Sequence, residues 1–339
     1  MVTRISWRMG VASSPIHHGE ILQGVFPHGS GLSRGLVTLP CAMYSVEARF
    51  TPADPTNLTH PTDLAGPADA ADGAGLVVSP SWKSKARQAA ELTLSSVGLP
   101  VQGHLELSGE VPLCRGFGSS TSDVLAAIGA VKDAFSLPLT AEHVARLAVQ
   151  AETASDSLMF GGSAVLFAHR EGVIIEDFEY PLPAVRVLGF GCRPEGGGRG
   201  TDTLALPPAR YTPAEIQRFT RLRTLLREAV LAKDTGLLGK VATASTRINQ
   251  RHLPIPALER ILAVVEEVGA LGLQTAHSGD IAGIIFDRDD PAVDTCIERA
   301  QQHLADIGIF EQWKFTTDDR DTVDSPSRVP PRHTRTAGR

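Results

Sequence analysis

The sequence lacks the features that mark several large classes of protein. Its 339 residues include only four cysteines, and no two of them have the C-x-x-C spacing of a metal or redox site: Cys41, Cys114, Cys192 and Cys296. Free thiols without a disulfide framework are typical of a reducing compartment. No apolar run approaches the roughly 20 residues that cross a bilayer, and the first ten residues lack the apolar core of a signal peptide. We therefore expect a cytoplasmic protein without membrane contact.

The chain also lacks an excess of basic residues. Its 32 Lys and Arg residues are outnumbered by 38 Asp and Glu residues, which gives a formal net charge of −6. A nucleic-acid-binding protein usually carries a basic patch, so no nucleic-acid partner is expected. The 42% of hydrophobic residues can form a sizeable core, and the length allows one large domain or two ordinary ones.

The most informative segment that is present runs from Val111 to Asp123. A short alternating strand at 104–107 precedes a bend with Gly116 and Gly118, and four hydroxyl residues follow at 119–122. Apolar residues then recur at helical spacing, so a helix is expected to begin at this bend. Its free N–H groups and positive dipole end can hold a polyphosphate, and glycines let a ligand reach the main chain. Ordinary helix capping is the alternative, although one cap needs neither four hydroxyls nor two glycines.

A second candidate segment carries two carboxylates. Glu152 and Asp156 are spaced four residues apart at the end of a predicted helix at 141–152, which must break before the apolar run 164–167. A carboxylate at such a corner is well placed to point into a cleft. Phosphoryl transfer to a hydroxyl needs a group that accepts or orients the hydroxyl proton. The alternative is a solvated helix face, which most Asp and Glu residues occupy.

The glycine-rich segment resembles a known nucleotide loop. Residues 112–121 follow the pattern P-x-x-x-G-[LF]-G-S-S-[AST], which is the signature of the GHMP kinases, the family of galactokinase, homoserine kinase and mevalonate kinase. In that family the loop wraps the phosphates of ATP, and one of its serines helps to hold Mg²⁺. The resemblance therefore implies ATP and Mg²⁺ as cofactors. The implied ATP contacts are Pro112, Arg115, Gly116, Phe117, Gly118, Ser119, Ser120 and Thr121.

Two further segments resemble the other family motifs, in the family's order. Residues 14–24 are similar to the N-terminal motif, most of all to its short form in the L-threonine kinases of the cobalamin pathway. Residues 273–286 are similar to the third motif, in the A-H-S-G form of the same branch, although Asp280 replaces the usual small residue. A tight turn and a hairpin turn are the alternatives. The implied substrate contacts are His18, Gly19, Glu20, Gln23, Ser278 and Gly279.

The resemblance also implies roles for four polar residues. Glu152 and Ser120 resemble the Mg²⁺ ligands of the family. Asp156 resembles the catalytic carboxylate, which acts on the proton of the acceptor hydroxyl. His17 stands where many relatives carry Lys or Arg, and it is the second catalytic candidate.

The architecture implied by the resemblance is an α+β fold of two domains. Residues 1–182 would form a ribosomal-protein-S5-domain-2-like domain and residues 183–316 a ferredoxin-like domain, with the active site between them. The Ser, Thr, Pro and mixed charges of 317–339 predict a disordered tail. Periodicity predicts one or two strands at 35–50 and helices at 82–97, 213–232 and 255–271, and the segment 185–191 is expected to start the second domain. In the helix at 82–97 the inward residues would be Ala86, Ala89, Ala90 and Leu94.

The implied activity is ATP- and Mg²⁺-dependent phosphorylation of a small hydroxylated substrate, preferably L-threonine or a related hydroxy-amino acid. Another alcohol (homoserine, a sugar or an isoprenoid-type acceptor) and a regulator that binds nucleotide without catalysis are the alternatives. The glycine cluster at 195–203 resembles a substrate- or phosphate-approaching stretch of the L-threonine kinases, and a mobile loop explains it equally well. The sequence leaves the oligomeric state open, with a homodimer as one hypothesis.

Overall fold

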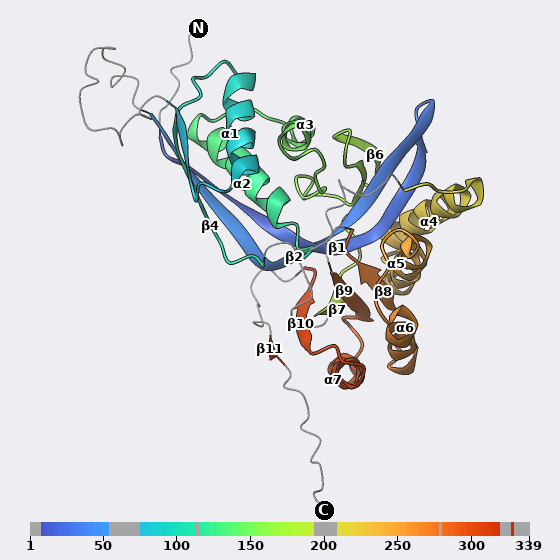
Figure 1. Ribbon diagram of the computed structural model, residues 1–339. Helices are drawn as coiled ribbons and strands as arrows, with labels where there is room; N and C mark the ends of the chain where they lie inside the picture. The colour runs from blue at the N-terminus through green and yellow to red at the C-terminus, as the bar shows by residue number, and fades with distance from the viewer. Residues whose placement is uncertain are drawn as a thin grey trace, which may run out of the picture.

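The computed structural model describes residues 8–53, 75–112, 115–192, 209–277 and 280–318, and the backbone of 327–328. The strands of these residues are β1 (Gly10–His28), β2 (Gly31–Pro52), β3 (Leu76–Ser79), β4 (Gly103–Ser108), β5 (Val165–Ala168), β6 (Val173–Asp177), β7 (Val185–Gly191), β8 (Gly272–Thr275), β9 (Ile281–Asp287), β10 (Glu311–Thr316) and β11 (Ser327–Arg328). They form a single sheet in the order β11-β10-β7-β9-β8-β1-β2-β4-β3, and β5 and β6 branch from β2 (Figure 1).

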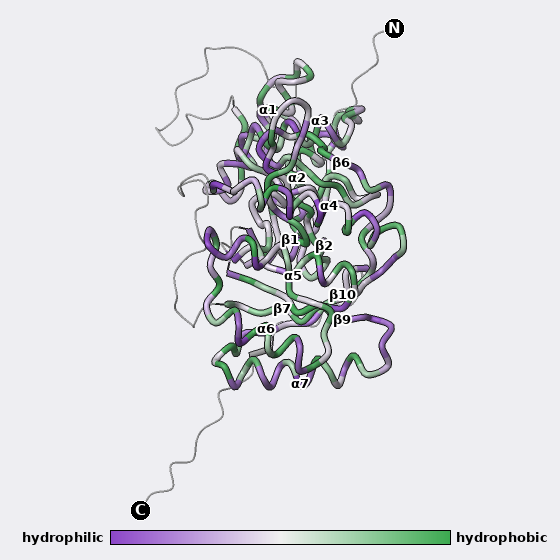
Figure 2. The backbone as a smooth tube through the Cα atoms, turned by 90° about the vertical axis from the view of Figure 1, so that its right-hand side faces the viewer, coloured by the Kyte–Doolittle hydropathy of each residue, from purple (hydrophilic) through white to green (hydrophobic). Residues whose placement is uncertain are grey.

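Helices cover this sheet in three groups. Helix α2 packs against β1, β2 and β4, and α1 and α3 pack against α2, whereas α4 and α5 lie against β1 and β8 (Figure 1). Helices α6 and α7 share a separate apolar core with β7 and β9, and Figure 2 shows mixed apolar and polar colouring along α7, as expected of a helix that covers one face. The helices are α1 (Ser84–Ser96), α2 (Ser119–Ala134), α3 (Ala141–Glu152), α4 (Pro213–Ala232), α5 (Thr235–Asn249), α6 (Leu258–Glu267) and α7 (Val293–Asp306).

The long hairpin of β1 and β2 joins the two halves of the sheet. Its pairing runs from Gly10 opposite Phe50 to His28 opposite Gly31. The register shifts three times between Pro15 and Leu22, which is the segment that resembles the N-terminal family motif. Such irregularities bend a strand and re-aim its side chains. The motif is therefore a kinked stretch within a strand, and neither a tight turn nor a solvated loop.

Helix α2 lies close to the hairpin because its inner face consists of small residues. Ala126, Ala127, Ala130 and Ala134 are all fully buried. A Cβ added to Gly10 would lie 2.1 Å from the carbonyl oxygen of Ala130. This close packing fixes the start of α2, and with it the glycine-rich loop, beside the kinked part of β1.

Several predicted elements are confirmed. The helices at 141–152 and 213–232 are α3 and α4. The segment 185–191, for which no secondary structure was predicted, is strand β7. The helix at 82–97 is α1, and the four residues expected to face inward are buried. The region 35–50 belongs to one long strand, β2, which extends beyond it at both ends.

Other elements differ from the prediction. The helix at 255–271 is shorter, because α6 starts only after Ala257, which has a left-handed backbone conformation with φ 57°. Helices α5 and α7 were not predicted. The glycines of α5 hide its helical pattern but allow close packing, since a Cβ on Gly239 would lie 2.3 Å from the carbonyl oxygen of Leu271. Most of the predicted loop at 51–74, the glycine cluster at 195–203 and most of the predicted tail at 317–339 lie outside the described residues.

The predicted division near residue 182 falls just before β7. The core around α6 and α7 is built entirely from residues between Leu188 and Ile309, which agrees with a second domain of its own. The sheet nevertheless continues across this division, because Glu20 of β1 pairs with Thr275 of β8. The α+β fold class is as predicted, while the boundary itself stays a proposal. Among the described helices, none has both the length and the apolar character needed to cross a bilayer.

Candidate active site

The glycine-rich loop adopts backbone conformations that favour glycine. Gly116 has φ 99° and Gly118 has φ 67°, both in the left-handed region. Gly118 is the residue before α2, and no side chain among the described residues caps the helix there. The hydroxyl of Ser122 donates to the carbonyl oxygens of Pro15 and Gly118, at 2.8 and 3.1 Å. The hydroxyls at 120–122 thus serve contacts other than capping, which argues against the simple capping interpretation.

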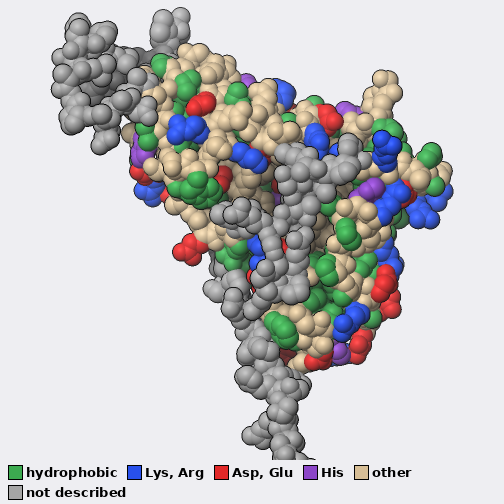
Figure 3. All heavy atoms as spheres, viewed as in Figure 1, with side chains coloured by type: hydrophobic (Ala, Val, Ile, Leu, Met, Phe, Trp, Pro, Cys, Tyr) green, Lys and Arg blue, Asp and Glu red, His purple; other side chains and the backbone are tan. Residues whose placement is uncertain are grey.

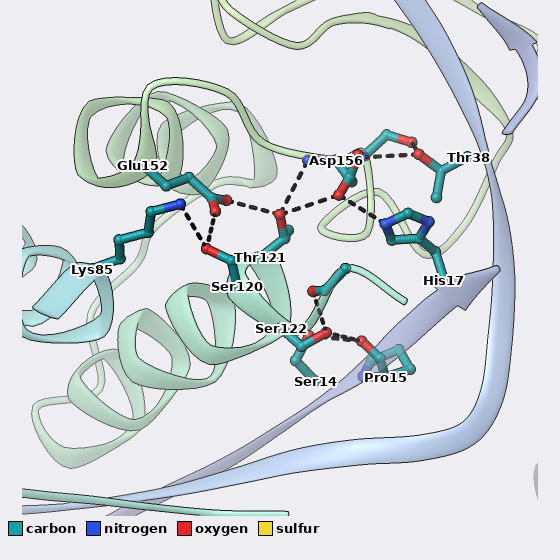
Figure 4. Close-up of polar contacts among 12 residues, drawn as sticks. Ser14, Pro15, His17, Thr38, Lys85, Ser120, Thr121, Ser122, Glu152 and Asp156 are labelled. Atoms are coloured by element: carbon teal, nitrogen blue, oxygen red, sulfur yellow. Dashed lines mark hydrogen bonds and ion pairs between the residues drawn. The ribbon is translucent and has the colours of Figure 1, made fainter. Parts of the chain in front are cut away.

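The two hydroxyl residues before Ser122 donate hydrogen bonds to Glu152, the predicted metal ligand. Ser120 Oγ donates to Glu152 Oε2 at 2.7 Å, and Thr121 Oγ1 donates to Glu152 Oε1 at 2.8 Å (Figure 4). Glu152 ends α3 and is only 4% exposed. Burial, despite the hydrogen bond from Ser120, raises the pKa of Glu152 to about 7. A cation beside this carboxylate would therefore favour its ionised form.

Thr121 also connects Glu152 to the second carboxylate. Its Oγ1 lies 3.2 Å from Asp156 Oδ2 and accepts the backbone N–H of Asp156 at 3.4 Å (Figure 4). The chain leaves α3 at Thr153, with φ 72°, so that Asp156 lies in the corner before β5. Both carboxylates thus converge on the first turn of α2.

The imidazole of His17 lies on the other side of Asp156. His17 Nε2 is 2.9 Å from Asp156 Oδ2; the His17 side chain is 3% exposed and that of Asp156 is 20% exposed. Burial opposes the charge on His17, but the carboxylates of Asp156 and Glu20 outweigh it and raise the pKa of His17 to about 9. Burial likewise opposes the charge on Asp156, and His17 outweighs it, so the pKa of Asp156 is lowered to about 2. Near neutral pH both side chains are therefore charged.

Glu20 completes this group of residues. It offers one oxygen within 4.8 Å of the ligand atoms of His17 and Asp156. Glu20 is 2% exposed, and its Oε2 has no hydrogen-bond partner among the described residues. Burial raises the pKa of Glu20 to about 8. Gln23, also buried, contacts His277 through its side-chain oxygen, 2.7 Å from Nδ1.

Two predicted substrate contacts are core residues in this fold. His18 is fully buried and packs against the rings of Phe117, Trp313 and Phe315. Its Nδ1 lies within hydrogen-bond distance of the Gln274 amide, and burial lowers the pKa of His18 to about 3. A substrate contact of His18 has no support from this packing.

The Cα of Gly19 is crowded by neighbouring protein atoms, so a substrate cannot approach it from the side on which a Cβ would lie. Gly19 adopts φ 68°, and an added Cβ would lie 2.4 Å from Oε1 of Gln274 and 2.8 Å from the carbonyl carbon of Thr275. Glycine is needed at this position because β8 comes very close to the kinked part of β1. Gly19 thus serves the fold and gives no direct support to the predicted contact.

The first residues of the nucleotide loop hold it against the second half of the sheet. Arg115 Nε donates to Asp280 at 2.7 Å, and its two terminal nitrogens donate to the carboxylate of Glu311 on β10 at 3.0 and 2.6 Å. Phe117 is buried against Trp313. These contacts leave the predicted ATP contacts of the Arg115 and Phe117 side chains without support. Ser278 and Gly279, predicted to contact substrate, lie outside the described residues.

Sequence analysis missed two lysines at the start of α1. Lys85 Nζ donates to Ser120 Oγ at 3.1 Å, and Lys83 Nζ pairs with Asp123 of α2 at 2.6 Å (Figure 4 shows Lys85). Lys83 and Asp123 are both largely buried, whereas Lys85 is exposed. Figure 3 shows basic side chains on this face of the molecule. Cations are unfavourable at the positive end of a helix dipole, so two lysines at a helix start were the signal for a functional reason.

Known proteins match both halves of the chain. The family model for the N-terminal domain of the GHMP kinases matches residues 84–168, and the model for the C-terminal domain matches 226–305. The chain belongs to the GHMP kinase family. It is therefore a phosphotransferase that uses ATP and acts on a hydroxyl group, as the three motifs predicted.

Two curated relatives of this GHMP kinase act on amino acids, according to their names. It is 27% identical to an L-threonine kinase of Salmonella typhimurium over 307 residues, which cover 90% of this chain and 91% of the relative. It is 26% identical to a homoserine kinase of Lactococcus lactis subsp. cremoris over 54% of this chain and 62% of the relative.

Solved structures confirm the fold of this GHMP kinase. The homoserine kinase of Cytophaga hutchinsonii superimposes with a TM-score of 0.61 at 13% identity, over 93% of this chain and 95% of that one. The mevalonate kinase of Staphylococcus aureus superimposes with a TM-score of 0.56 at 13% identity, over 91% and 98%. At such low sequence identity, the structural similarity supports a shared fold and nothing more.

Proposed function

We propose that this GHMP kinase transfers the γ-phosphoryl group of ATP to the hydroxyl of L-threonine or a related hydroxy-amino acid. One observation carries the proposal. A row of side chains at the start of α2 joins Ser120 and Glu152, through Thr121, to the ion pair of Asp156 and His17. Phosphoryl transfer needs a phosphate-binding helix start, an oxygen-rich metal site and a polar group at the acceptor hydroxyl, side by side.

The residues present fit Mg²⁺. This ion prefers oxygen ligands in octahedral geometry, in which two neighbouring ligands are roughly 2.9 Å apart. Ser120 Oγ and Glu152 Oε2, which are 2.7 Å apart, would hold it. When bound, Mg²⁺ neutralises negative charge on the phosphates. The N–H groups at the start of α2 and the ammonium of Lys85 would bind the phosphate oxygens beside it.

Asp156 would accept a hydrogen bond from the acceptor hydroxyl. With a pKa lowered to about 2 it is ionised at neutral pH but is a weak base. Because the transition state of phosphoryl transfer is loose, orienting the hydroxyl is expected to matter more than removing its proton. His17 would keep the Asp156 carboxylate ionised and in place. As an imidazolium it supplies the positive charge that many relatives take from Lys or Arg.

The preference for a hydroxy-amino acid is supported by the relatives named L-threonine kinase and homoserine kinase. Homoserine is therefore the second candidate acceptor. The two differ in the position of the hydroxyl, which is on the β-carbon in threonine and on the γ-carbon in homoserine.

The test is ADP release by the purified protein with ATP, Mg²⁺ and a panel of L-threonine, L-serine, L-homoserine, sugars and polyols. We expect the highest kcat/KM with L-threonine and no release with Asp156→Asn above about 1% of wild type. Preferential turnover of a sugar or polyol would overturn the substrate class. ATP binding by calorimetry without turnover of any acceptor would instead indicate a regulator on this fold.

A further inference from the structure

The proposed mechanism leaves one corner of the site unexplained. Next to Asp156 the rings of His169 and His277 stack edge to face, with centroids 5.4 Å apart. His169 is 5% exposed, and its Nδ1 has no hydrogen-bond partner among the described residues. Burial lowers the pKa of His169 to about 3 and lowers that of His277 as well, so both rings are neutral.

Two arginines surround this histidine pair. The positive charges of Arg34 and Arg170 both contribute to the lowered pKa of each histidine, which places them close to the pair. The pairing of Leu36 with Phe167 is antiparallel, so continuing it by two residues puts Arg34 of β2 opposite His169. Arg170 follows directly in the chain.

Neither arginine has an acidic partner among the described residues. In the described ranges Arg34 and Arg170 form no ion pair, unlike Arg115 or Arg223, and the buried Nε of Arg170 lacks a hydrogen-bond partner. Two unpaired guanidinium groups beside neutral rings attract an anion, and a carboxylate matches their fork of donors.

The carboxyl group of Glu20, which would bind a cation and not an anion, lies further along the same face of the sheet. Glu20 is paired with Thr38, and Thr38 is four residues from Arg34 on β2. Alternate residues of a strand share a face, so Arg34 and Thr38 are on one side, roughly 13 Å apart between Cα atoms. The buried Oε2 of Glu20 lacks a partner there, and an ammonium group would provide one.

We propose that Glu20 binds the ammonium group and that Arg34 and Arg170 bind the carboxylate of an α-amino acid acceptor. This inference rests on the proposed function and names the residues that select the acceptor. Asp156 is near both groups, because its oxygen lies within 4.8 Å of that of Glu20 and its charge acts on His169 and His277. A β-hydroxy-amino acid carries its ammonium and hydroxyl on adjacent carbons. With the ammonium on Glu20, its hydroxyl reaches Asp156.

The test combines a variant of each proposed binding residue with an acceptor that lacks the group which this residue would bind. L-threonine is compared with L-threoninamide, which lacks the carboxylate charge, and with 3-hydroxybutyrate, which lacks the ammonium. The variants are Arg34→Gln, Arg170→Gln and Glu20→Gln, with Arg218→Gln on the exposed side of α4 as the matched control. KM and kcat are measured for each acceptor, and KM for ATP is measured in parallel.

Arg34→Gln and Arg170→Gln are each expected to raise KM for L-threonine about 10- to 100-fold, the effect of losing one hydrogen bond to a charged group. KM for L-threoninamide should stay within about twofold of wild type, because its carboxylate is already missing. Glu20→Gln should raise KM for L-threonine by a similar factor and leave KM for 3-hydroxybutyrate unchanged. Arg218→Gln and all values of KM for ATP should match wild type.

Equal effects on L-threonine and on the truncated acceptor, or no effect on either, would overturn the inference. If Arg34→Gln melts at a much lower temperature than wild type, Arg34→Lys answers the same question, since a lysine keeps the charge without the fork. The proposed function fails separately, when wild type phosphorylates no hydroxy-amino acid. L-threonine turnover with fully active arginine variants would sink only this inference.

Discussion

Gly118 and His17 are in direct contact. A Cβ on Gly118 would lie 2.1 Å from Cδ2 and 2.3 Å from Nε2 of His17, and the backbone N–H of His17 donates to the carbonyl oxygen of Phe117 at 3.2 Å. The phosphate loop therefore packs directly against the proposed catalytic pair of His17 and Asp156. Any side chain on Gly118 disturbs both, in addition to blocking the approach of phosphate to the main chain.

Gly118→Val should therefore weaken ATP binding by more than tenfold and lower kcat as well. The residue has φ 67°, which a β-branched side chain rarely adopts, and valine would displace His17. Calorimetric titration with ATP measures the first effect and ADP release the second. Gly161→Val is the matched control, because nothing lies within 4 Å of its Cβ position. Unchanged ATP affinity in a folded Gly118→Val protein would remove the loop from the nucleotide site.

Glu152→Gln should raise the Mg²⁺ concentration that half-maximal activity requires. A neutral amide is a weaker Mg²⁺ ligand than a carboxylate, while the hydrogen bonds from Ser120 and Thr121 can still be accepted by its oxygen. A Mg²⁺ titration of activity at fixed ATP is the measurement, with Glu228→Gln on the exposed face of α4 as control. Superimposable titrations of Glu152→Gln and wild type would show that this carboxylate holds no metal.

Asp156→Asn should lower kcat about 100-fold or somewhat more, with little change in ATP affinity. General-base assistance is typically worth about 10²–10⁴-fold, and the low pKa of Asp156 points to the lower end of that range. His17→Ala should behave similarly, and His17→Lys should recover part of the activity because it restores a cation. Normal turnover by Asp156→Asn together with an inactive His17→Ala would move the catalytic role to His17.

The same ion pair should make stability depend on pH at both ends of the range. The pKa of His17 is raised from 6.5 to about 9, so its contribution is complete below pH 6.5 and is lost as the pH rises to 9. The pKa of Asp156 is lowered from 3.8 to about 2, so its contribution is complete above pH 3.8 and is lost as the pH falls to 2. Melting temperatures of wild type should fall more steeply between pH 6.5 and 9 than those of His17→Gln. Parallel curves would contradict this assignment.

Arg115→Gln should destabilise the protein by about 1–3 kcal/mol, because it leaves the largely buried Asp280 without its partner. ATP affinity should also fall, since the pair fastens the nucleotide loop to the second half of the sheet. Denaturant unfolding measures the stability. Arg247→Gln is the control: its pair with Glu259 is exposed, and such pairs contribute about 0–1 kcal/mol. Equal losses in the two variants would show that the Arg115 pair has no special role.

The sequence by itself determined the elements with clear periodicity and the order of the three motifs. Helices α3 and α4 were predictable because their apolar residues recur at helical spacing between recognisable ends. The loop at 112–121 was predictable because glycines and hydroxyls directly before a helix have a specific physical use. From these motifs followed the family, the α+β fold and the kinase activity.

Only the tertiary structure decided which residues meet. The family motif marked His17 as a catalytic candidate and His18 as a substrate contact, but it did not show that His17 pairs with Asp156 while His18 lies among aromatic rings in the core. A strand irregularity sets the directions of the two side chains. Arg115 and Arg34 look equally free in the sequence, yet one is held by two carboxylates and the other is unpaired in the described part of the chain. Charge and direction at these positions depend on partners more than a hundred residues away, and local sequence carries no record of them.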